Sequence, residues 1–409
     1  MSRKEKVIIV LLAAINFTHI LDFMIMMPLG NYLMPHFQIS PKQFSILLAS
    51  YPISSFLSGI LMALFADRFE RKRLLLFTYA GFIIGTAACG FSQSYDFLLV
   101  SRIVAGIFGG IIGGQILSMI GDLFVYERRG AAMGAVMSAF AVASSIGVTF
   151  SLYLVDIFKD DWHVPFLFVA LLASLILPLC YFYLPILKAH LEQQTENSHN
   201  KINQLWNTLT AKSTGLALLF SGLMMMGHFL IIPFINPYME FNKGYPRSVT
   251  PLIYLVGGVA SFVAAVFLGR LSDRIGKLTV FSYCVPLSFI MVLMITNLPT
   301  LPFSIVLSFF AIWFALATGR AVSSQTMVSN VTGSASRGSF MSLNSSIQHL
   351  GTGAAALVSG YIVTEDNNGR LIHYEWVGYL SVLVLLAGFF LGRYLFRNTE
   401  NIKSKNLKL

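Results

Sequence analysis

The sequence has few charged residues, and this shortage limits the class of protein. Only 11% of its 409 residues are Asp, Glu, Lys or Arg, whereas 56% are hydrophobic, and the mean hydropathy is +0.72. Soluble domains carry about 25% charged residues, so an ordinary soluble fold is excluded. Helices are the usual way to satisfy backbone groups in lipid. We therefore predict an all-α integral membrane protein.

Cysteine and the common catalytic motifs are also scarce. The three cysteines, Cys89, Cys180 and Cys284, each lie inside an apolar segment, far apart and without metal-site spacing. The sequence contains no Walker A motif, no His-Glu-x-x-His and no Gly-x-Ser-x-Gly. These absences argue against direct ATP coupling and against the simplest intramembrane enzymes. We therefore expect no enzymatic activity, no metal and no cofactor.

The chain does contain a series of apolar stretches that can each cross a bilayer, which needs about 20 residues. Charged residues, Pro, Asn or Gly separate them. The first stretch continues past any small-residue cleavage point, so we interpret it as a membrane helix rather than a signal peptide. The twelve predicted helices span residues 7–29, 43–64, 74–92, 96–118, 131–155, 162–186, 216–237, 249–269, 278–296, 301–320, 338–363 and 375–396.

A charged turn occurs twice, about half a chain length apart. Asp67-Arg68 follows the second predicted helix and Asp273-Arg274 follows the eighth, an offset of 206 residues. Arg129-Gly130 and Arg337-Gly338 recur at an offset of 208. Such recurrences indicate two pseudo-symmetric six-helix bundles related by an axis along the membrane normal. The predicted parts are an N-terminal bundle (1–186), a cytoplasmic linker (187–215), a C-terminal bundle (216–397) and a cytoplasmic tail (398–409).

Basic residues are distributed unequally between the two sides of the predicted membrane. The side with both termini, the Asp-Arg turns and the linker carries 22 Lys and Arg residues, and the other side carries five. Because basic loops favour the cytoplasm, we expect a multi-pass protein of the inner, cytoplasmic membrane with both termini in the cytoplasm. The same rule explains the net charge of +10 without nucleic acid. This count places Arg320 in a cytoplasmic turn and leaves Arg102 inside a helix.

Together these motifs resemble the major facilitator superfamily. The family pattern Gly-x-Leu-Ala-Asp-Arg-x-Gly-Arg-Lys is similar to the second turn, GRLSDRIGK, whereas the first turn has Ala63 and Glu70 in place of glycines. Arg102, followed by GIFGGIIGG, resembles the helix-four motif of the drug–proton antiporter branch, which includes arabinose-efflux-permease-like proteins. The helix-five motif of that branch, Gly-Pro-x-x-Gly-Gly, is incomplete, since GVTFSL keeps only Gly147.

The resemblance implies a secondary transporter that works by alternating access. The branch implies proton-coupled efflux of a small, amphipathic substrate by a monomer in the lipid bilayer, with helices one, four, seven and ten around a central cavity. A proton-independent facilitator, or an importer of a small polar metabolite, is the alternative. An intramembrane enzyme or a channel would be a different class again.

One carboxylate is predicted to lie deep in the membrane. Of 18 acidic residues, only Asp22 falls well inside a predicted helix, where an unpaired charge costs several kcal/mol. At about 1.5 Å per residue, Asp22 and Arg102 lie at similar depths, about 21–22 Å from the inner face. His19 precedes Asp22 by three residues and shares its helical face. We predict that Asp22, His19 and Arg102 couple transport to protons; a purely structural ion pair is the alternative.

Other polar residues are candidates for the substrate cavity. His19, His228 and His349 fall at about 16–18 Å depth on three helices. A neutral, hydrogen-bonded histidine is the alternative for each of them. A metal site is disfavoured, because no cysteine or second acid joins them. The predicted cavity residues are His228, His349, Gln115, Asn344 and Gln348.

The two charged turns are predicted to form a conformational latch. Their aspartates would accept hydrogen bonds or ion pairs across a helix interface and hold the halves in an outward-open state. Because Glu70 adds a negative charge, the first turn is expected to be the weaker one. The latch residues are Asp67, Arg68, Arg71, Asp273, Arg274 and Lys277.

Overall fold

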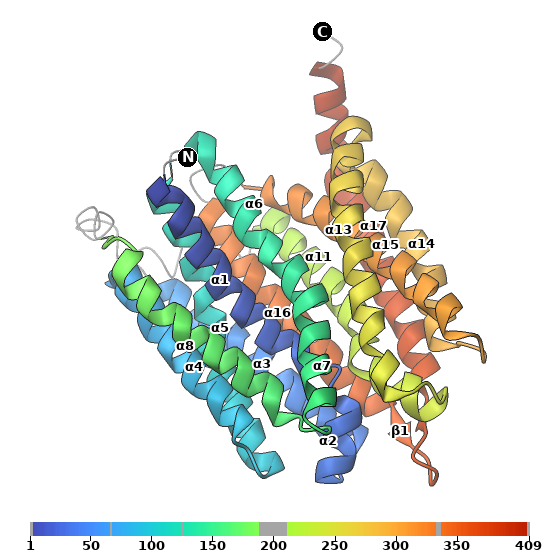
Figure 1. Ribbon diagram of the computed structural model, residues 1–409. Coiled ribbons are helices and arrows are strands. Elements are labelled where there is room, and N and C mark those ends of the chain that lie inside the picture. Colours follow the sequence, from blue (N-terminus) through green and yellow to red (C-terminus); the bar gives the residue numbers. More distant parts are fainter. Residues whose placement is uncertain (1–2, 66–67, 125, 188–210, 333–336, 407–409) are drawn as a thin grey trace.

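The computed structural model describes residues 3–65, 68–124, 126–187, 211–332 and 337–406 (Figure 1). These ranges are almost entirely helical, apart from a short antiparallel pair of strands, β1 (Thr364–Glu365) and β2 (Leu371–Ile372). The N- and C-terminal helices begin and end at the same end of the molecule (Figure 1). We call this the terminal end, and we call the opposite end, where α2 and β1 lie, the distal end.

In the first half, the first and fifth spans are both interrupted. A break at residues 26–29 separates α1 from α2, and a π-helical turn (Ala143–Gly147) separates α6 from α7. The helices of this half are α1 (Arg3–Ile25), α2 (Gly30–Phe37), α3 (Pro41–Phe65), α4 (Arg71–Gly90), α5 (Tyr95–Leu123), α6 (Tyr126–Val142), α7 (Val148–Ile157) and α8 (His163–Tyr183).

In the second half, the seventh span is interrupted near the position that corresponds to the break after α1. Here α11 gives way to a 3-10 turn (Ile232–Phe234), α12 and a π-helical turn (Tyr238–Asn242). The helices of this half are α11 (Lys212–Phe229), α12 (Ile235–Pro237), α13 (Pro251–Ile275), α14 (Lys277–Thr296), α15 (Phe303–Ser329), α16 (Arg337–Ile362) and α17 (Tyr374–Asn406).

The twelve-helix architecture predicted from the sequence is confirmed. Eleven helical segments among the described residues are long and apolar enough to cross a membrane. The twelfth is α16, which has 26 residues but carries a polar series that includes Asn344, Gln348 and His349. Most of the predicted linker (187–215) lies outside the described residues.

The predicted turn at Arg320 is wrong. α15 continues to Ser329, and Arg320 lies inside it with only 3% of its surface exposed. The misleading signal is the polar run after Arg320, which reads as a loop. In the helix, Ser324 donates to the Arg320 carbonyl and Thr326 donates to the Val322 carbonyl. These bonds to the preceding turn satisfy the hydroxyl groups and allow the helix to continue.

Buried hydrophobic residues form three clusters, and their distribution shows where the halves meet. The cluster at the distal end combines residues of both halves. Toward the terminal end, the buried residues of one cluster all belong to the first half and those of the other all belong to the second. The ribbons of α6 and α13 also diverge toward the terminal end (Figure 1). The cluster of buried hydrophobic residues that both halves share therefore lies at the distal end of the described structure.

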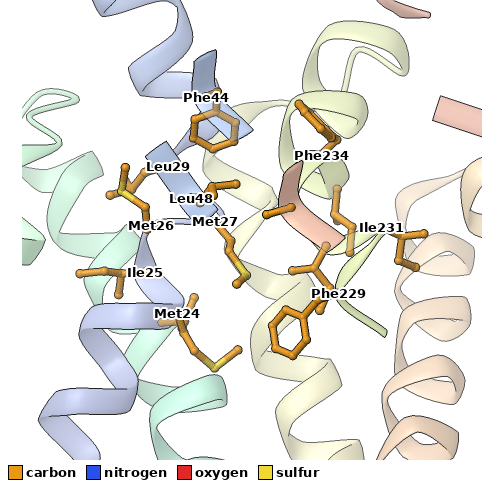
Figure 2. Packing of buried hydrophobic residues seen from close by; sticks show 14 of the residues in the cluster. Met24, Ile25, Met26, Met27, Leu29, Phe44, Leu48, Phe229, Ile231 and Phe234 are labelled. Carbon is orange, nitrogen blue, oxygen red and sulfur yellow. The ribbon is translucent and has the colours of Figure 1, made fainter. Parts of the chain in front are cut away.

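Figure 2 shows the centre of the shared cluster, where the break after α1 meets the end of α11. The rings of Phe44 on α3 and Phe234 lie 6.1 Å apart between centroids, across the two halves. Asn236 also donates its side-chain amide to the Pro28 carbonyl at 3.2 Å. We call this contact the distal seal; it includes Met24, Met27, Leu29, Phe44, Phe229, Ile231 and Phe234.

Small residues allow α3 of the first half to pack closely on α16 of the second. A Cβ atom added to Gly353 would lie 2.7 Å from Ile53, and one added to Gly59 would lie 2.6 Å from the Ser346 hydroxyl. Helices approach this closely where side chains are absent or small. This interface is therefore a close approach of two helix backbones, which side chains at these glycine positions would obstruct.

Candidate functional site

Asp22 on α1 and Arg102 on α5 form a buried ion pair. Arg102 Nη1 donates to Asp22 Oδ2 at 2.8 Å, and the two side chains are 1% and 0% exposed respectively. The guanidinium lies 4.5 Å from the centroid of the Tyr51 ring on α3. Asp22 Oδ1 and Arg102 Nε have no hydrogen-bond partner. The pairing inferred from helix depth is therefore present, and the pair keeps unused hydrogen-bonding capacity.

Close packing of α5 on α3 holds this pair in place. A Cβ atom added to Gly106 would lie 2.5 Å from the Tyr51 carbonyl oxygen, and one added to Gly110 would overlap Ser55. Gly113, one turn further on, has no atom within 4 Å of such a Cβ. The glycine series after Arg102 thus has a packing role in its first part, whereas Gly113 borders open space.

His19 lies one turn from Asp22 on α1 and is buried. Neither of its ring nitrogens makes a well-formed hydrogen bond. Its ring lies 6.1 Å from that of Tyr51, and His349 of the second half is close enough to interact with it electrostatically. A structural histidine would be expected to have hydrogen-bond partners. The structure therefore brings His19, Asp22 and Arg102 together and leaves the imidazole available for a ligand or a proton.

The second half contains a buried arginine next to His228. Arg320 Nη2 on α15 lies 2.9 Å from His228 Nδ1 on α11. Because arginine can only donate, Nδ1 accepts and the imidazole proton resides on Nε2. The His228 ring stacks on Trp313 with centroids 5.0 Å apart. The sequence did not identify Arg320 as a site residue, because the segment that follows it, AVSSQTMVSN, is mostly polar and resembles a loop.

The remaining predicted cavity residues lie on α5 and α16. Gln348 donates to Gln325 of α15 at 3.1 Å. Asn344 is fully buried, yet neither atom of its side-chain amide has a hydrogen-bond partner, and Gln115 Oε1 also lacks one. Buried amides normally find partners, so these unsatisfied groups are candidates for binding a polar ligand. His349 is half-buried and faces His19 across the halves.

The structure contains a polar network at the distal end that the sequence analysis did not predict. Arg247 donates to Glu240 at 2.7 Å and to the carbonyl oxygen of Asn31, in the other half, at 3.2 Å. Asn31 in turn donates to Glu240, Arg247 lies over the Tyr32 ring at 4.5 Å, and Asp160 lies 3.7 Å from Arg247. The network joins segments of the two halves that lie more than 200 positions apart in the sequence, as in the pair Asn31 and Arg247, so the sequence gave no sign of it. We call these five residues the distal gate; beside them, between α7 and α13, is a cavity of about 320 Å³.

The first predicted latch turn makes its described contacts within one half. Asp67 lies outside the described residues. Arg68 is exposed and lies 5.3 Å from the centroid of the Phe65 ring. Arg71 donates to Asp122 of α5 at 3.2 Å. These contacts connect the turn to its own bundle.

The second latch turn is similar in this respect. Asp273 pairs with Lys277 four residues later, and Arg274 is exposed. This pairing is local rather than across an interface between helices of different halves. The terminal ends have separate cores in this structure, so the latch that we expect for the opposite conformation remains a prediction.

Glu70, the charge that distinguishes the first turn from the second, accepts hydrogen bonds from three backbone N–H groups, and the expectation that this turn is the weaker latch stays a prediction. Glu70 caps α4 by accepting from the backbone N–H groups of Lys72 and Arg73, and it also accepts from Leu187, each at 2.9 Å. Burial disfavours the charged form, but these three donors outweigh burial and hold the pKa of the Glu70 carboxyl below its usual value. An anion at a helix N-terminus is stabilising, so the negative charge of Glu70 stabilises the start of α4.

The described residues contain no group of three or more His, Cys, Asp and Glu side chains placed to hold a metal ion. Of the predicted site residues, Asp22, Arg102 and His19 form a polar cluster in the first half. His228 lies in a second polar cluster in the other half, with Arg320 and Trp313, which the sequence did not predict as site residues.

Comparison with known sequences identifies the family of the chain. The family model of the Major Facilitator Superfamily matches residues 12–318 and 217–408. AraJ of Escherichia coli (strain K12), a transporter by name, is 26% identical over 243 residues, which cover 58% of this chain and 59% of AraJ. The uncharacterized MFS-type transporter YceJ of Bacillus subtilis (strain 168) is 20% identical over 368 residues, 90% of either chain.

Solved structures of transporters superpose on the whole molecule. A bacterial homologue of the human lysosomal transporter Spinster, in an inward-facing and occupied conformation, gives a TM-score of 0.76 at 14% identity, with 97% of this chain and 98% of that chain covered. The D-xylose-proton symporter gives a TM-score of 0.74 at 17% identity, with 94% and 96% covered. The chain belongs to the Major Facilitator Superfamily and is a multi-pass membrane transporter that works by alternating access.

Proposed function

We propose that the protein exports a small, amphipathic molecule across the cytoplasmic membrane in exchange for protons. The observation that supports this most directly is the ion pair between Asp22 and Arg102. Asp22 is the one acidic residue of 18 that lies well inside a predicted membrane helix, and the pair is buried at 2.8 Å. An ionisable group in this setting is a functional candidate because its burial is costly.

The chemistry of the pair suits proton exchange. While Asp22 is ionised, it attracts the Arg102 guanidinium; once a proton binds, the carboxyl is neutral and this attraction weakens. The unpartnered oxygen Oδ1 can receive the proton without displacing Arg102. His19, one turn toward the terminal end, has two available ring nitrogens and can pass the proton on. Loading and release can then alternate with the conformation of the two halves.

The orientation is proposed from the distribution of basic residues, and efflux is proposed together with it. Because Arg320 lies inside α15, the terminal side carries 21 rather than 22 Lys and Arg residues, and the distal side carries five. This excess of basic residues still favours a cytoplasmic terminal end. With that orientation, the distal seal and distal gate close the outer face. The structure then corresponds to an inward-facing state, in which the site can take up a cytoplasmic substrate and release a proton.

Proton coupling occurs on this fold in another protein, as the name of the D-xylose-proton symporter states. The alternative for this chain is a facilitator or an importer of a small polar metabolite, in which Asp22 and Arg102 only hold α1 against α5. The two possibilities differ in whether an imposed pH gradient drives transport.

The test uses purified protein in proteoliposomes. A thermal-shift screen of small amphipathic compounds at two pH values first provides a transported compound. We expect Asp22→Asn to abolish transport driven by a pH gradient but to keep counterflow exchange, because exchange needs alternating access without net proton movement. Asp96→Asn, at an exposed acid in the first turn of α5, is the matched control. Wild-type transport that ignores the gradient would reject the proton role.

A further inference from the structure

In the described part of the chain, two arginines but one carboxylate are buried within the membrane-spanning helices, beyond the first turn of each. Arg102 uses that carboxylate, Asp22. Arg320 is equally enclosed, and no ion pair with a carboxylate is formed by it among the residues that the structure describes. Its Nη1 atom has no hydrogen-bond partner at all. One positive charge in the centre of the molecule is therefore left without a counter-charge.

Among the described residues, the groups beside Arg320 do not neutralise it. A guanidinium does not lose its proton in proteins, and burial of an uncompensated charge is costly. His228 accepts one hydrogen bond as a neutral ring but brings no negative charge. The other titratable neighbour is the thiol of Cys284, which carries no charge when protonated. A positive charge kept in such a place points to an anion that comes from outside the protein.

The groups around Arg320 indicate the chemistry of that anion. Trp313 is fully buried, stacks on His228 and contacts Phe314 edge to face with centroids 4.8 Å apart. The buried hydroxyl of Ser323, three residues along the same helical face, has no hydrogen-bond partner. The site thus offers one cation, one additional donor and an aromatic wall.

We propose that Arg320 binds the negatively charged group of the substrate and that the transported molecule is a small monocarboxylate with an apolar, preferably aromatic, body. This deepens the proposed function, on which it rests, by naming the class of substrate. A guanidinium binds a carboxylate through two parallel hydrogen bonds, and Nη1 is available for one of them. A single uncompensated arginine matches a single negative charge, so multiply charged molecules are disfavoured.

The competing explanation is that Arg320 only joins α15 to α11 through His228. Thermal unfolding of the ligand-free protein in detergent separates the two. Arg320→Gln removes an uncompensated buried charge, so we expect its unfolding midpoint to equal or exceed that of the wild type. Arg102→Gln leaves Asp22 without its partner and should lower the midpoint. A loss in Arg320→Gln as large as that in Arg102→Gln would overturn the proposal.

Ligand selectivity provides the direct test. The wild type, Arg320→Gln and Arg320→Lys are titrated with benzoate, phenylacetate and indole-3-acetate, each beside its neutral amide, and tryptophan fluorescence and thermal shift are recorded. We expect the wild type to prefer the carboxylates over the amides by roughly tenfold or more. Arg320→Gln should lose this preference, and Arg320→Lys should keep part of it. Equal binding of amides, an unchanged preference in Arg320→Gln, or no carboxylate binding by the wild type would each reject the proposal.

Asp22→Asn separates this inference from the proposed function. It should keep the preference for carboxylates, because Asp22 is paired with Arg102 rather than Arg320. A wild type that selects carboxylates but ignores a pH gradient would remove proton coupling alone. If a pH gradient drives transport by the wild type but the wild type prefers the neutral amides, the anion site at Arg320 is rejected and proton coupling is kept.

Discussion

Arg247 of the second half donates through Nη2 to the carbonyl oxygen of Asn31 in the first half, 3.2 Å away. The same guanidinium pairs with Glu240, whose other partner is the Asn31 side chain. A charged residue of one half is thereby bound to backbone and side chain of the other. This bond exists only while the distal ends are together, so it contributes to the stability of one conformation and not of the other.

The distal gate should therefore control the conformational equilibrium. Arg247→Gln removes the ion pair and the bond to Asn31, and we expect it to disfavour the distal-closed state by about 1–2 kcal/mol, a factor of roughly 5–30 in populations. Distances between spin labels on α7 and α13 measure this shift. Arg370→Gln, at an exposed distal arginine, is the control. Equal populations in wild type and Arg247→Gln would contradict the role of the gate.

The ion pair of Asp22 and Arg102 should show strong energetic coupling. Arg102→Gln alone leaves a buried carboxylate, which costs about 3–5 kcal/mol. Asp22→Asn together with Arg102→Gln should recover most of this loss, because a neutral pair needs no counter-charge. The free energy of unfolding of the two single variants and the double variant gives the coupling. Additive losses would show that the two side chains do not depend on each other.

The crossing of α3 and α16 should not tolerate added side chains. A Cβ atom at Gly360 would overlap Ser45 and one at Gly353 would lie 2.7 Å from Ile53, so Gly360→Ala and Gly353→Ala should each cost about 1–3 kcal/mol by overpacking. Unfolding midpoints and transport rates provide the measurement. Gly269→Ala is the control, since nothing lies within 4 Å of a Cβ there. Wild-type behaviour of Gly360→Ala would mean that the halves are further apart.

Glu70 should give the stability of α4 a pH dependence. Its pKa is held below the usual value, so the ionised carboxylate contributes stability at neutral pH that is lost as the pH falls through the folded-state pKa. Glu70→Ala should therefore lower the free energy of unfolding at pH 7 by about 1 kcal/mol, with a smaller difference from the wild type in acid. Asp96→Ala is the control. A difference that grows in acid would contradict the capping role.

The predicted latch can be tested by the same distance measurements at the terminal end. If Asp67 and Asp273 hold the halves together there in the outward-open state, then Asp67→Asn and Asp273→Asn should each lower the population of that state. Because Glu70 accepts backbone hydrogen bonds in the first turn, we expect Asp67→Asn and Asp273→Asn to lower the population of the outward-open state by different amounts. Unchanged populations in both variants would reject the latch.

Local properties of the sequence were sufficient for the membrane class, the twelve helices and the duplication. Hydropathy acts over about 20 neighbouring residues, so it needs no knowledge of distant contacts. Depth along a straight helix is also a one-dimensional quantity, and it predicted the partnership of Asp22 and Arg102, which the structure confirms at 2.8 Å. The same count treated the first and seventh spans as straight, and thus missed the breaks that form the distal seal.

Tertiary structure alone decided the rest. Arg320 lies inside α15 because Ser324 and Thr326 return their hydroxyl groups to the helix backbone, a choice that the composition of the segment does not reveal. Arg247, Glu240 and Asn31 meet because two halves of the chain close on each other, and their spacing along the sequence carries no sign of it. Which end is closed depends on the free energies of two global packings of one sequence, which no local pattern encodes.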